Sequence, residues 1–320
     1  MRIVVALGGN ALLKRGEPMT YAAQRTNVRI AAVALADLAR DHQIVVAHGN
    51  GPQVGLMALQ AAAYAPKTLW PLDVLGAETE GMIGYLIEQE LMNALPKGAE
   101  CATLLTRVEV DRNDPAFDQP TKPIGPVYTA EQARLAHAEH LWSMVSDPTG
   151  GLRRVVPSPL PQRILGLAAI RLLVDGGVCV ICAGGGGIPV FRGATGEMEG
   201  VEAVIDKDRT AALLAQALGA DALLMLTDVA AVVRDWGGAQ AADIAETTPE
   251  ALDEISFAAG SMAPKVASAC AFVRGGGSLA GIGRLQDARA ILEGRAGTRV
   301  RAARVAGPSQ GTGEPGAGGP

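Results

Sequence analysis

The chain has 320 residues and a formal net charge of −5; 48% of its residues are hydrophobic and only 3% are aromatic. This acidic balance offers no electrostatic footprint for nucleic acid, and no apolar run reaches the roughly 18 residues that a membrane-spanning helix needs. Four cysteines are too few for a disulfide framework. Because the N-terminus enters a strand directly and does not resemble a signal peptide, we expect a cytoplasmic protein with a large aliphatic core.

The first 110 residues alternate between strand-like and helix-like segments. Strands are expected at 2–7, 43–47 and 102–110, and helices at 21–40, 53–64 and 74–95. Short apolar strands that alternate with amphipathic helices predict a parallel sheet covered by helices on both faces.

Residues 111–161 interrupt this alternation. The segment opens with DRNDPAFDQPTKPIGP, contains a helical pattern at 129–142 and ends with RRVVPSPLP. Because it also carries apolar residues, we interpret it as an inserted subdomain and not as a linker. The α/β pattern then resumes. Helices are expected at 163–175, 209–220, 249–256, 264–274 and 286–294, and strands at 178–183, 223–229, 278–284 and 298–305. Residues 306–320 are expected to be disordered because their composition cannot bury apolar surface.

Glycine-rich turns follow three of the expected strands, with LGGN at 7–10, HGNG at 48–51 and GGGG at 184–187. In an open α/β sheet, ligands bind beyond the carboxyl ends of the strands. Glycine lets a ligand approach the backbone, and backbone N–H groups there suit phosphate oxygens. One such turn alone could be an ordinary connection, but three together favour an anion-binding site. His48 could contact the ligand, although a structural histidine with satisfied hydrogen bonds is the favoured interpretation.

The common nucleotide-binding fingerprints are missing. The sequence has no G-x-x-x-x-G-K-[ST] motif, and no G-x-G-x-x-G follows the first strand. Phosphate chemistry would therefore rely on separate lysines, and the candidates are Lys122, Lys207 and Lys265. Phosphoryl transfer requires positive charges placed on the transferring group and on the leaving oxygen. The alternative is that these are surface lysines, with Lys207 paired to its neighbours and Asp208 serving as a helix N-cap.

Several motifs, taken together and in order, resemble the carbamate kinases. They are VALGGNALL at 5–13, VAHGNGPQVG at 46–55, TKPIGP at 121–126, VVPSP at 155–159, GGGGIPV at 184–190, GVEAVIDKD at 200–208 and GSMAPKV at 260–266. The resemblance implies the amino-acid-kinase fold, an α/β three-layer sandwich with a large, mainly parallel central sheet and a small inserted lid subdomain. It implies an N-terminal lobe at 1–215 for the phosphoryl acceptor, with the lid at 111–161, and a C-terminal lobe at 216–305 for ATP or ADP.

The resemblance also implies an activity. That activity is reversible phosphoryl transfer between ATP and carbamate, giving ADP and carbamoyl phosphate, used to make ATP in arginine catabolism. Mg²⁺ would accompany the nucleotide, no metal would be held by the protein alone, and the chain would form a homodimer without nucleic-acid or membrane partners.

The resemblance assigns roles to individual residues. Lys122 would act from the lid, Lys207 would bridge acceptor and phosphate, Lys265 would stabilise the leaving oxygens of the nucleotide, and Asp208 would orient the lysines. The residues implied to bind the transferring phosphate and the acceptor are Gly8, Gly9, Asn10, Gly49, Asn50 and Gly51. Those implied to line the nucleotide site are Thr227, Asp228, Trp236, Met262, Pro264 and Lys265.

Two departures affect the nucleotide site. The run AAVVRDWGG after Val229 and the glycine-rich segment from 274 onwards differ from the usual family pattern, so that Trp236 would replace the usual adenine contact or that contact would be lost. Two rival functions remain open. One is a related kinase for another carboxylate, such as acetylglutamate, or for a nucleoside monophosphate. The other is a non-catalytic nucleotide-binding protein, against which the retention of all three lysines argues.

Overall fold

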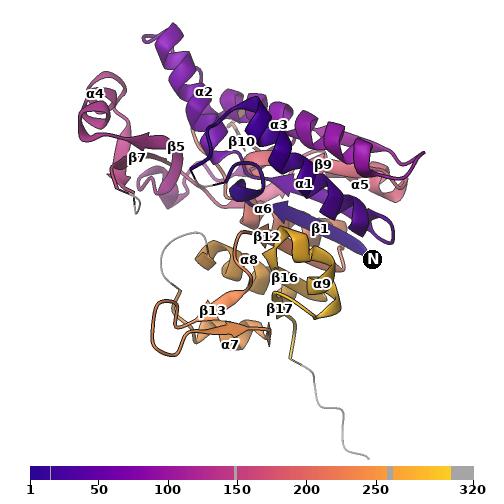
Figure 1. Ribbon diagram of the computed structural model, residues 1–320. Coiled ribbons are helices and arrows are strands. Elements are labelled where there is room, and N and C mark those ends of the chain that lie inside the picture. The colour runs from indigo at the N-terminus through magenta and orange to yellow at the C-terminus, as the bar shows by residue number, and fades with distance from the viewer. Residues whose placement is uncertain (15, 148–149, 258–261, 304–320) are drawn as a thin grey trace, which may run out of the picture.

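A computed structural model describes residues 1–14, 16–147, 150–257 and 262–303 of the chain (Figure 1). The segment 306–320, which the sequence predicts to be disordered, lies outside the described residues, and so does the end of the strand expected at 298–305. No helix in the described part of the chain is long and apolar enough to cross a membrane.

A large, mainly parallel sheet forms the centre of the molecule. Its strand order is β15-β17-β16-β12-β1-β2-β9-β3, and every neighbouring pair is parallel except β16 and β17. These strands are β1 (Arg2–Leu7), β2 (Gln43–His48), β3 (Cys101–Leu104), β9 (Cys179–Cys182), β12 (Ala222–Thr227), β15 (Glu246–Thr247), β16 (Leu279–Arg284) and β17 (Thr298–Val300). The predicted parallel sheet is therefore confirmed.

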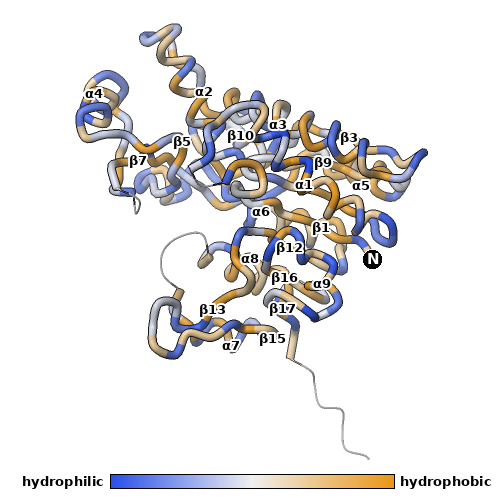
Figure 2. The backbone as a smooth tube through the Cα atoms, in the orientation of Figure 1, coloured by the Kyte–Doolittle hydropathy of each residue, from blue (hydrophilic) through white to orange (hydrophobic). Residues whose placement is uncertain are grey.

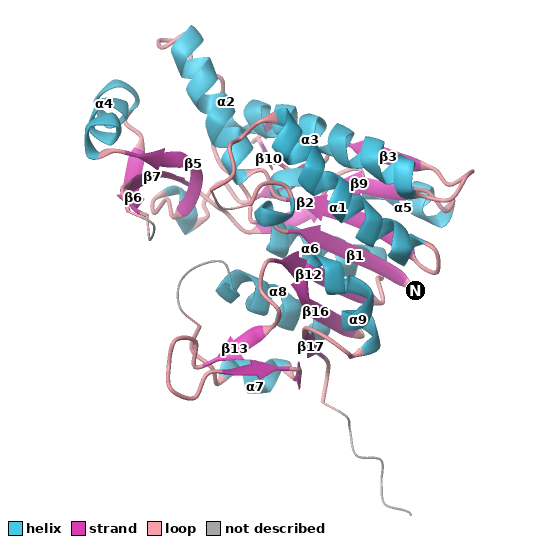
Figure 3. Ribbon diagram, in the orientation of Figure 1, coloured by secondary structure: helices cyan, strands magenta, loops and turns pink. Residues whose placement is uncertain are grey.

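Helices cover both faces of this sheet, as Figure 3 shows. Alternate residues of β1 explain the layering: Ile3 and Val5 face the helices α1, α3 and α9, whereas Val4 and Ala6 face α5, α6 and α8. The tube in Figure 2 is hydrophobic along these central strands. The three-layer sandwich expected from the resemblance is thus confirmed. The helices are α1 (Tyr21–Ala39), α2 (Gly51–Tyr64), α3 (Leu72–Ala94), α4 (Ala130–His140), α5 (Leu167–Asp175), α6 (Lys207–Leu218), α7 (Pro249–Asp253), α8 (Met262–Arg274) and α9 (Ala288–Glu293).

Within the interruption at 111–161, a separate three-stranded sheet carries helix α4 and stands to one side of the main sheet, next to α2 (Figure 1). Its strands, in the order β5-β7-β6, are β5 (Lys122–Tyr128), β6 (Ser143–Ser146) and β7 (Leu152–Val156). We call these three strands and α4 the inserted subdomain. Its Ile124 and Val156 pack with Val54 of α2 and Val204, so an apolar contact joins it to the body of the protein.

Two predicted boundaries are wrong. The single strand expected at 102–110 is two strands, because the chain turns at Leu105 and Thr106 and leaves the central sheet. The second of them, β4 (Arg107–Val110), joins a four-stranded sheet with β8 (Pro161–Ile164), β10 (Ile188–Arg192) and β11 (Met198–Gly200). The helix expected at 163–175 begins only at Leu167, because β8 precedes it and Gly166 adopts a left-handed conformation with φ of 77°.

A small hairpin, β13 (Val232–Arg234) and β14 (Ala242–Ile244), was not predicted from the sequence. It follows β12 and lies below the main sheet in Figure 1, close to α7. Short 3-10 turns complete the described chain at Gly9–Ala11, Pro115–Phe117, Gly184–Gly186 and Leu285–Asp287.

Candidate active site

The start of helix α6 sets the positions of the charged residues in the motif GVEAVIDKD. Asp206 is the N-cap of this helix, and its side chain accepts hydrogen bonds from the backbone N–H groups of Asp208 at 3.0 Å and Arg209 at 3.3 Å. A carboxylate at this position satisfies amide donors that have no partner inside the helix. The alternative interpretation of Asp208 as the N-cap is therefore wrong. Asp208 is the second residue of the helix, and its side chain is available for other contacts.

Asp208 binds two of the three candidate lysines. Its Oδ1 lies 2.7 Å from Nζ of Lys207, and its Oδ2 lies 2.8 Å from Nζ of Lys265 at the start of α8. The three side chains are 4%, 12% and 6% exposed for Asp208, Lys207 and Lys265. Lys207 and Lys265 are therefore not surface lysines, although the expected pairing of Lys207 with a neighbouring aspartate is confirmed. A buried carboxylate holds both ammonium groups at the carboxyl edge of the central sheet.

Lys122, at the start of β5, reaches the same helix from the inserted subdomain. Its Nζ lies 2.9 Å from Oδ2 of Asp206, and about a fifth of each side chain is exposed. Three ammonium groups therefore share two adjacent carboxylates, which leaves one positive charge in excess. An excess positive charge at a partly buried edge favours an anionic ligand.

The pKa values of these groups are shifted by their mutual contacts. Burial works against the carboxylates of Asp208 and Asp206, but the neighbouring ammonium groups outweigh it and hold both pKa values well below the ordinary value. Burial likewise works against the Lys207 ammonium, yet the two aspartates raise its pKa. For Lys265, burial and the nearby Lys207 ammonium together lower the pKa. A negative charge beside Lys265 would counteract this lowering of its pKa.

The first two glycine turns meet at Lys207. A Cβ atom on Gly49 would lie 3.5 Å from Cδ of Lys207 and 3.6 Å from the backbone nitrogen of Gly9. The lysine stem therefore runs across Gly49, and Gly9 lies beside it. Gly8 packs tightly on β12, because a Cβ there would lie 2.9 Å from the carbonyl oxygen of Leu226. Asn10 follows in the same 3-10 turn as Gly9.

The third glycine turn packs against Asn50. A Cβ on Gly185 would lie 2.2 Å from Nδ2 of Asn50, so the backbone of the turn contacts the carboxamide directly. The Asn50 side chain is buried and donates a hydrogen bond of 2.9 Å to Oγ1 of Thr79. Gly51 begins α2 close to the inserted subdomain, where a Cβ would lie 3.9 Å from the carbonyl oxygen of Pro123.

The residues predicted to line the nucleotide site come from three elements. Thr227 ends β12, and its hydroxyl lies 3.1 Å from Oδ1 of Asp228. Met262, Pro264 and Lys265 form the first turn of α8. Trp236 occupies the turn between β13 and β14, where its side chain is 75% exposed. The structure thus shows Trp236 as a surface side chain of the hairpin, and its adenine contact stays a prediction.

Sequence reasoning missed a buried group of residues beneath the glycine turns. Glu80 and Thr79 of α3 and Thr106 after β3 are 1% exposed or less. His48 is fully buried; its Nδ1 contacts the carbonyl oxygen of Gly49, while its Nε2 has no hydrogen-bond partner. Burial lowers the pKa of His48 to about 4 and raises that of Glu80 to about 8. The satisfied structural histidine that the sequence favoured is therefore wrong in part: His48 is buried, but only its Nδ1 has a hydrogen-bond partner among the described residues.

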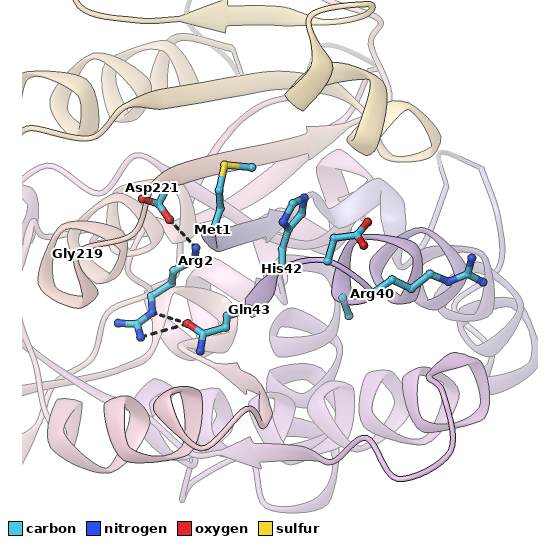
Figure 4. Close-up of a pocket in the computed structure, with 9 residues that line it drawn as sticks. Met1, Arg2, Arg40, His42, Gln43, Gly219 and Asp221 are labelled. Carbon is cyan, nitrogen blue, oxygen red and sulfur yellow. Dashed lines mark hydrogen bonds between the residues drawn. The ribbon is translucent and has the colours of Figure 1, made fainter.

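A concavity of about 670 Å³ lies near the amino ends of β1 and β2 (Figure 4). It is lined by Met1, Arg2, Ala39, Arg40, Asp41, His42, Gln43, Gly219 and Asp221. Because ligands of open α/β sheets bind at the carboxyl ends of the strands, this concavity is on the wrong edge for the lysine cluster. We therefore place the candidate active site at the lysines and glycine turns.

Comparisons with known proteins show similarity to one family over most of the chain. The model of the amino acid kinase family matches residues 1–282. A carbamate kinase of Rhizobium meliloti (strain 1021) is 55% identical over 302 residues, which cover 94% of this chain and 93% of that protein. One of Haemophilus influenzae is 55% identical over 300 residues, covering 94% and 96%. The solved structure of carbamate kinase from Giardia lamblia bound to AMP-PNP has a TM-score of 0.85 at 38% identity and covers 94% and 98% of the two chains.

Proposed function

The chain belongs to the amino acid kinase family and, within it, to the carbamate kinases; from this premise we propose how its residues transfer a phosphoryl group between ATP and carbamate. The observation that carries the proposal is the pair of lysines on Asp208, joined by Lys122 from the inserted subdomain. Phosphoryl transfer demands positioning and electrostatic stabilisation more than covalent chemistry, and this cluster supplies both.

We assign the acceptor side to the inserted subdomain and the glycine turns. Lys207 lies against Gly49 and Gly9, so its ammonium reaches the junction of the first two turns. Backbone N–H groups of Gly9, Asn50 and Gly51 would bind oxygens of the transferring phosphate and of carbamate. Lys122 would exchange its hydrogen bond to Asp206 for one to the acceptor as the inserted subdomain closes as a lid. Asn10 would join this phosphate site.

We assign the nucleotide side to the C-terminal end of β12 and the first turn of α8. Lys265 lies in the first turn of α8, Thr227 ends β12 and Asp228 follows it, so the β-phosphate of ADP would lie between these elements with Lys265 on its leaving oxygens. Burial and the Lys207 ammonium lower the pKa of Lys265, so an anionic phosphate beside it would favour its charged form. The N-terminal residues 1–215 would thus hold the acceptor and residues 216–305 the nucleotide.

We propose that a magnesium ion arrives with the nucleotide and takes few ligands from the described residues. Among them, no group of three or more His, Cys, Asp or Glu side chains is arranged to hold a metal, and Asp206 and Asp208 are both taken by lysines. Mg²⁺ is commonly bound by substrate phosphates and water with few protein ligands. Bound in this way, it would neutralise charge on the nucleotide phosphates.

We also propose a physiological setting. Carbamoyl phosphate is a mixed anhydride, so transfer to ADP is the favourable direction, and the enzyme would make ATP at the end of arginine breakdown. A cytoplasmic location suits nucleotide substrates and the unpaired cysteines. A homodimer suits the exposed apolar side chains on the α1 and α3 layer, where Ile30, Val33 and Tyr85 are 49%, 62% and 59% exposed.

Incubation of the protein with MgADP and carbamoyl phosphate, with ATP measured by a coupled assay, tests the reaction. We expect ATP formation that stops when Mg²⁺ is chelated with EDTA and resumes when Mg²⁺ is restored. Folded protein that makes no ATP contradicts the proposal, and so does transfer from ATP to acetylglutamate or a nucleoside monophosphate in preference to carbamate. Light scattering of the same sample tests the dimer.

A further inference from the structure

The turn after β9 has an unusual backbone. Ala183, Gly185, Gly186 and Gly187 all have positive φ, at 53°, 68°, 96° and 86°. Glycine adopts this region without strain, but for alanine it costs energy because Cβ approaches the following carbonyl group. A strained residue persists only where its surroundings hold it in place. Neighbouring residues must therefore hold the turn 183–187 in this conformation.

Two buried side chains bind the first two amides of this turn. The hydroxyl of Thr106 accepts a hydrogen bond from the N–H of Ala183 at 3.0 Å, and Oε1 of Glu80 accepts one from the N–H of Gly184 at 2.7 Å. The other carboxylate oxygen, Oε2, accepts from the N–H of Thr106 at 3.1 Å. Glu80 and Thr106 therefore hold the turn and each other. Both are 1% exposed, so water does not compete for these bonds.

The held turn faces the acceptor site. Gly185 packs on the carboxamide of Asn50, which is itself bound by Thr79, the residue before Glu80 on α3. Within the described residues, the N–H of Gly185 donates no hydrogen bond, whereas the neighbouring amides of the turn do. Helix α3 thus holds Asn50 through Thr79, and it holds the turn against which Asn50 packs through Glu80.

We propose that Glu80 and Thr106 are positioning residues for the phosphoryl acceptor. They hold the turn 183–187 in its left-handed conformation, so that the N–H of Gly185 is presented beside Asn50 to an anionic oxygen of carbamate or carbamoyl phosphate. The inference rests on the proposed function and names a new part of the same site. It concerns the acceptor alone, because the hydrogen bonds of Glu80 and Thr106 join α3, the turn 183–187 and each other.

Glu80→Gln tests the first residue. At pH 9, above the raised pKa of Glu80, the carboxylate accepts through both oxygens, whereas the amide nitrogen of glutamine cannot accept a hydrogen bond; either Gly184 or Thr106 then loses its acceptor while the shape of the side chain is kept. We expect KM for carbamoyl phosphate to rise about tenfold, the effect of losing roughly one such bond, while KM for ADP changes less than about twofold. Amide hydrogen exchange of residues 183–187, followed by mass spectrometry, should become faster than in the wild type.

Glu90→Gln is the matched control. Glu90 is also a buried glutamate of α3, but it pairs with Arg25 at 2.6 Å and Arg29 at 3.1 Å, on the side towards α1. We expect this variant to lose stability without a selective change in KM for carbamoyl phosphate and without faster exchange at 183–187. If the two variants behave alike, or if Glu80→Gln raises both KM values equally, Glu80 is merely structural and the proposal is overturned.

Thr106→Val and Thr106→Ser test the second residue. Valine keeps the shape but removes the hydroxyl that accepts from Ala183, whereas serine keeps it. We expect the valine variant to show the same selective rise in KM and the same faster exchange, and serine to restore both towards wild-type values. Unchanged KM and exchange in Thr106→Val would overturn the role of this residue. The exchange readout needs no substrate, so a wild-type protein that made no ATP would contradict the proposed function and leave this measurement interpretable.

Discussion

Asp208 and Lys265 are 57 residues apart in sequence, yet Oδ2 of the aspartate lies 2.8 Å from Nζ of the lysine inside the protein. This contact joins α6 to α8, and Asp208 holds Lys207 with its other oxygen. A single buried carboxylate therefore fixes the distance between the two lysines that we assign to the acceptor and to the nucleotide. We propose that this carboxylate has both a structural role and a catalytic one.

Asp208→Asn should abolish most activity and also destabilise the fold. An amide of the same shape leaves two buried ammonium groups without their counter-charge, and breaking a buried ion pair costs on the order of 3–5 kcal/mol. Denaturant unfolding measures this cost. Asp253→Asn is the control, because Asp253 pairs with Arg274 where both side chains are about half exposed; we expect a loss below about 1 kcal/mol there. Equal losses in the two variants would contradict the importance of burial at Asp208.

Lys122→Ala should act on one substrate only. The ammonium lies on Asp206 at the edge of the inserted subdomain, so its removal should lower kcat/KM for carbamoyl phosphate by about 10²-fold, a typical effect of one transition-state donor. The affinity for ADP, measured by calorimetric titration, should change little. Lys122→Arg should also be impaired, because a planar fork does not replace a compact ammonium in a small site. A variant that loses ADP affinity but keeps its carbamoyl phosphate kinetics would place Lys122 on the other substrate.

How much of this site the sequence predicts depends on the type of residue. Lysines and glycines in specific motifs are identifiable, since few structural roles demand Lys207 between two aspartates or glycines at three strand ends. The structure shows that Lys207 and Lys265 are buried together on Asp208. Which aspartate caps α6 could not be predicted, because DKD offers two carboxylates and the choice depends on where the helix starts.

Glu80 could not be predicted for a different reason. It lies in a long helical pattern, where a glutamate is ordinarily a solvent-facing residue, and its partners are 26 and 104 residues away. Only the packing of α3 under the sheet edge makes it a buried acceptor. The split of 102–110 into β3 and β4 has the same origin, because Thr106 leaves the central sheet where Glu80 binds its N–H group.

The shifted pKa of Glu80 predicts how stability depends on pH. Its folded pKa is about 8 against an ordinary 4.5, so between these values the folded state retains a proton that the unfolded state releases, and stability falls as pH rises. His48 has a folded pKa of about 4 against an ordinary 6.5. Its contribution to the free energy of unfolding is therefore lost as pH falls from 6.5 to 4. Of Glu80 and His48, only Glu80 changes the free energy of unfolding between pH 6.5 and 8.

Denaturant unfolding at several pH values between 6.5 and 8 measures this contribution. We expect the free energy of unfolding of the wild type to fall across this range relative to that of Glu80→Gln, which cannot ionise. Parallel curves for the two proteins would show that Glu80 is already ionised in the folded state and that its two N–H donors outweigh its burial.

The contact between two motif glycines determines how the inserted subdomain packs against α2. Gly55 of α2 and Gly125 of β5 meet backbone to backbone, since a Cβ on Gly55 would lie 2.0 Å from Cα of Gly125, which itself has φ of 71°. Gly55→Ala must therefore push β5, and Lys122 with it, away from α2. Although alanine is the better helix former, overpacking costs roughly 1–3 kcal/mol, so we expect lower stability and about a tenfold rise in KM for carbamoyl phosphate.

Gly76→Ala supplies the matched control for this substitution. Gly76 is also a helical glycine, in α3, but a Cβ there meets no atom within 4 Å. Alanine should therefore stabilise the helix by up to about 1 kcal/mol and leave the kinetics unchanged. Thermal unfolding and steady-state kinetics of both variants separate the effect of helix propensity from the effect of displacing β5 and Lys122. If Gly55→Ala were as stable and as active as Gly76→Ala, the contact between α2 and β5 would have room to relax, and the position of Lys122 would not depend on it.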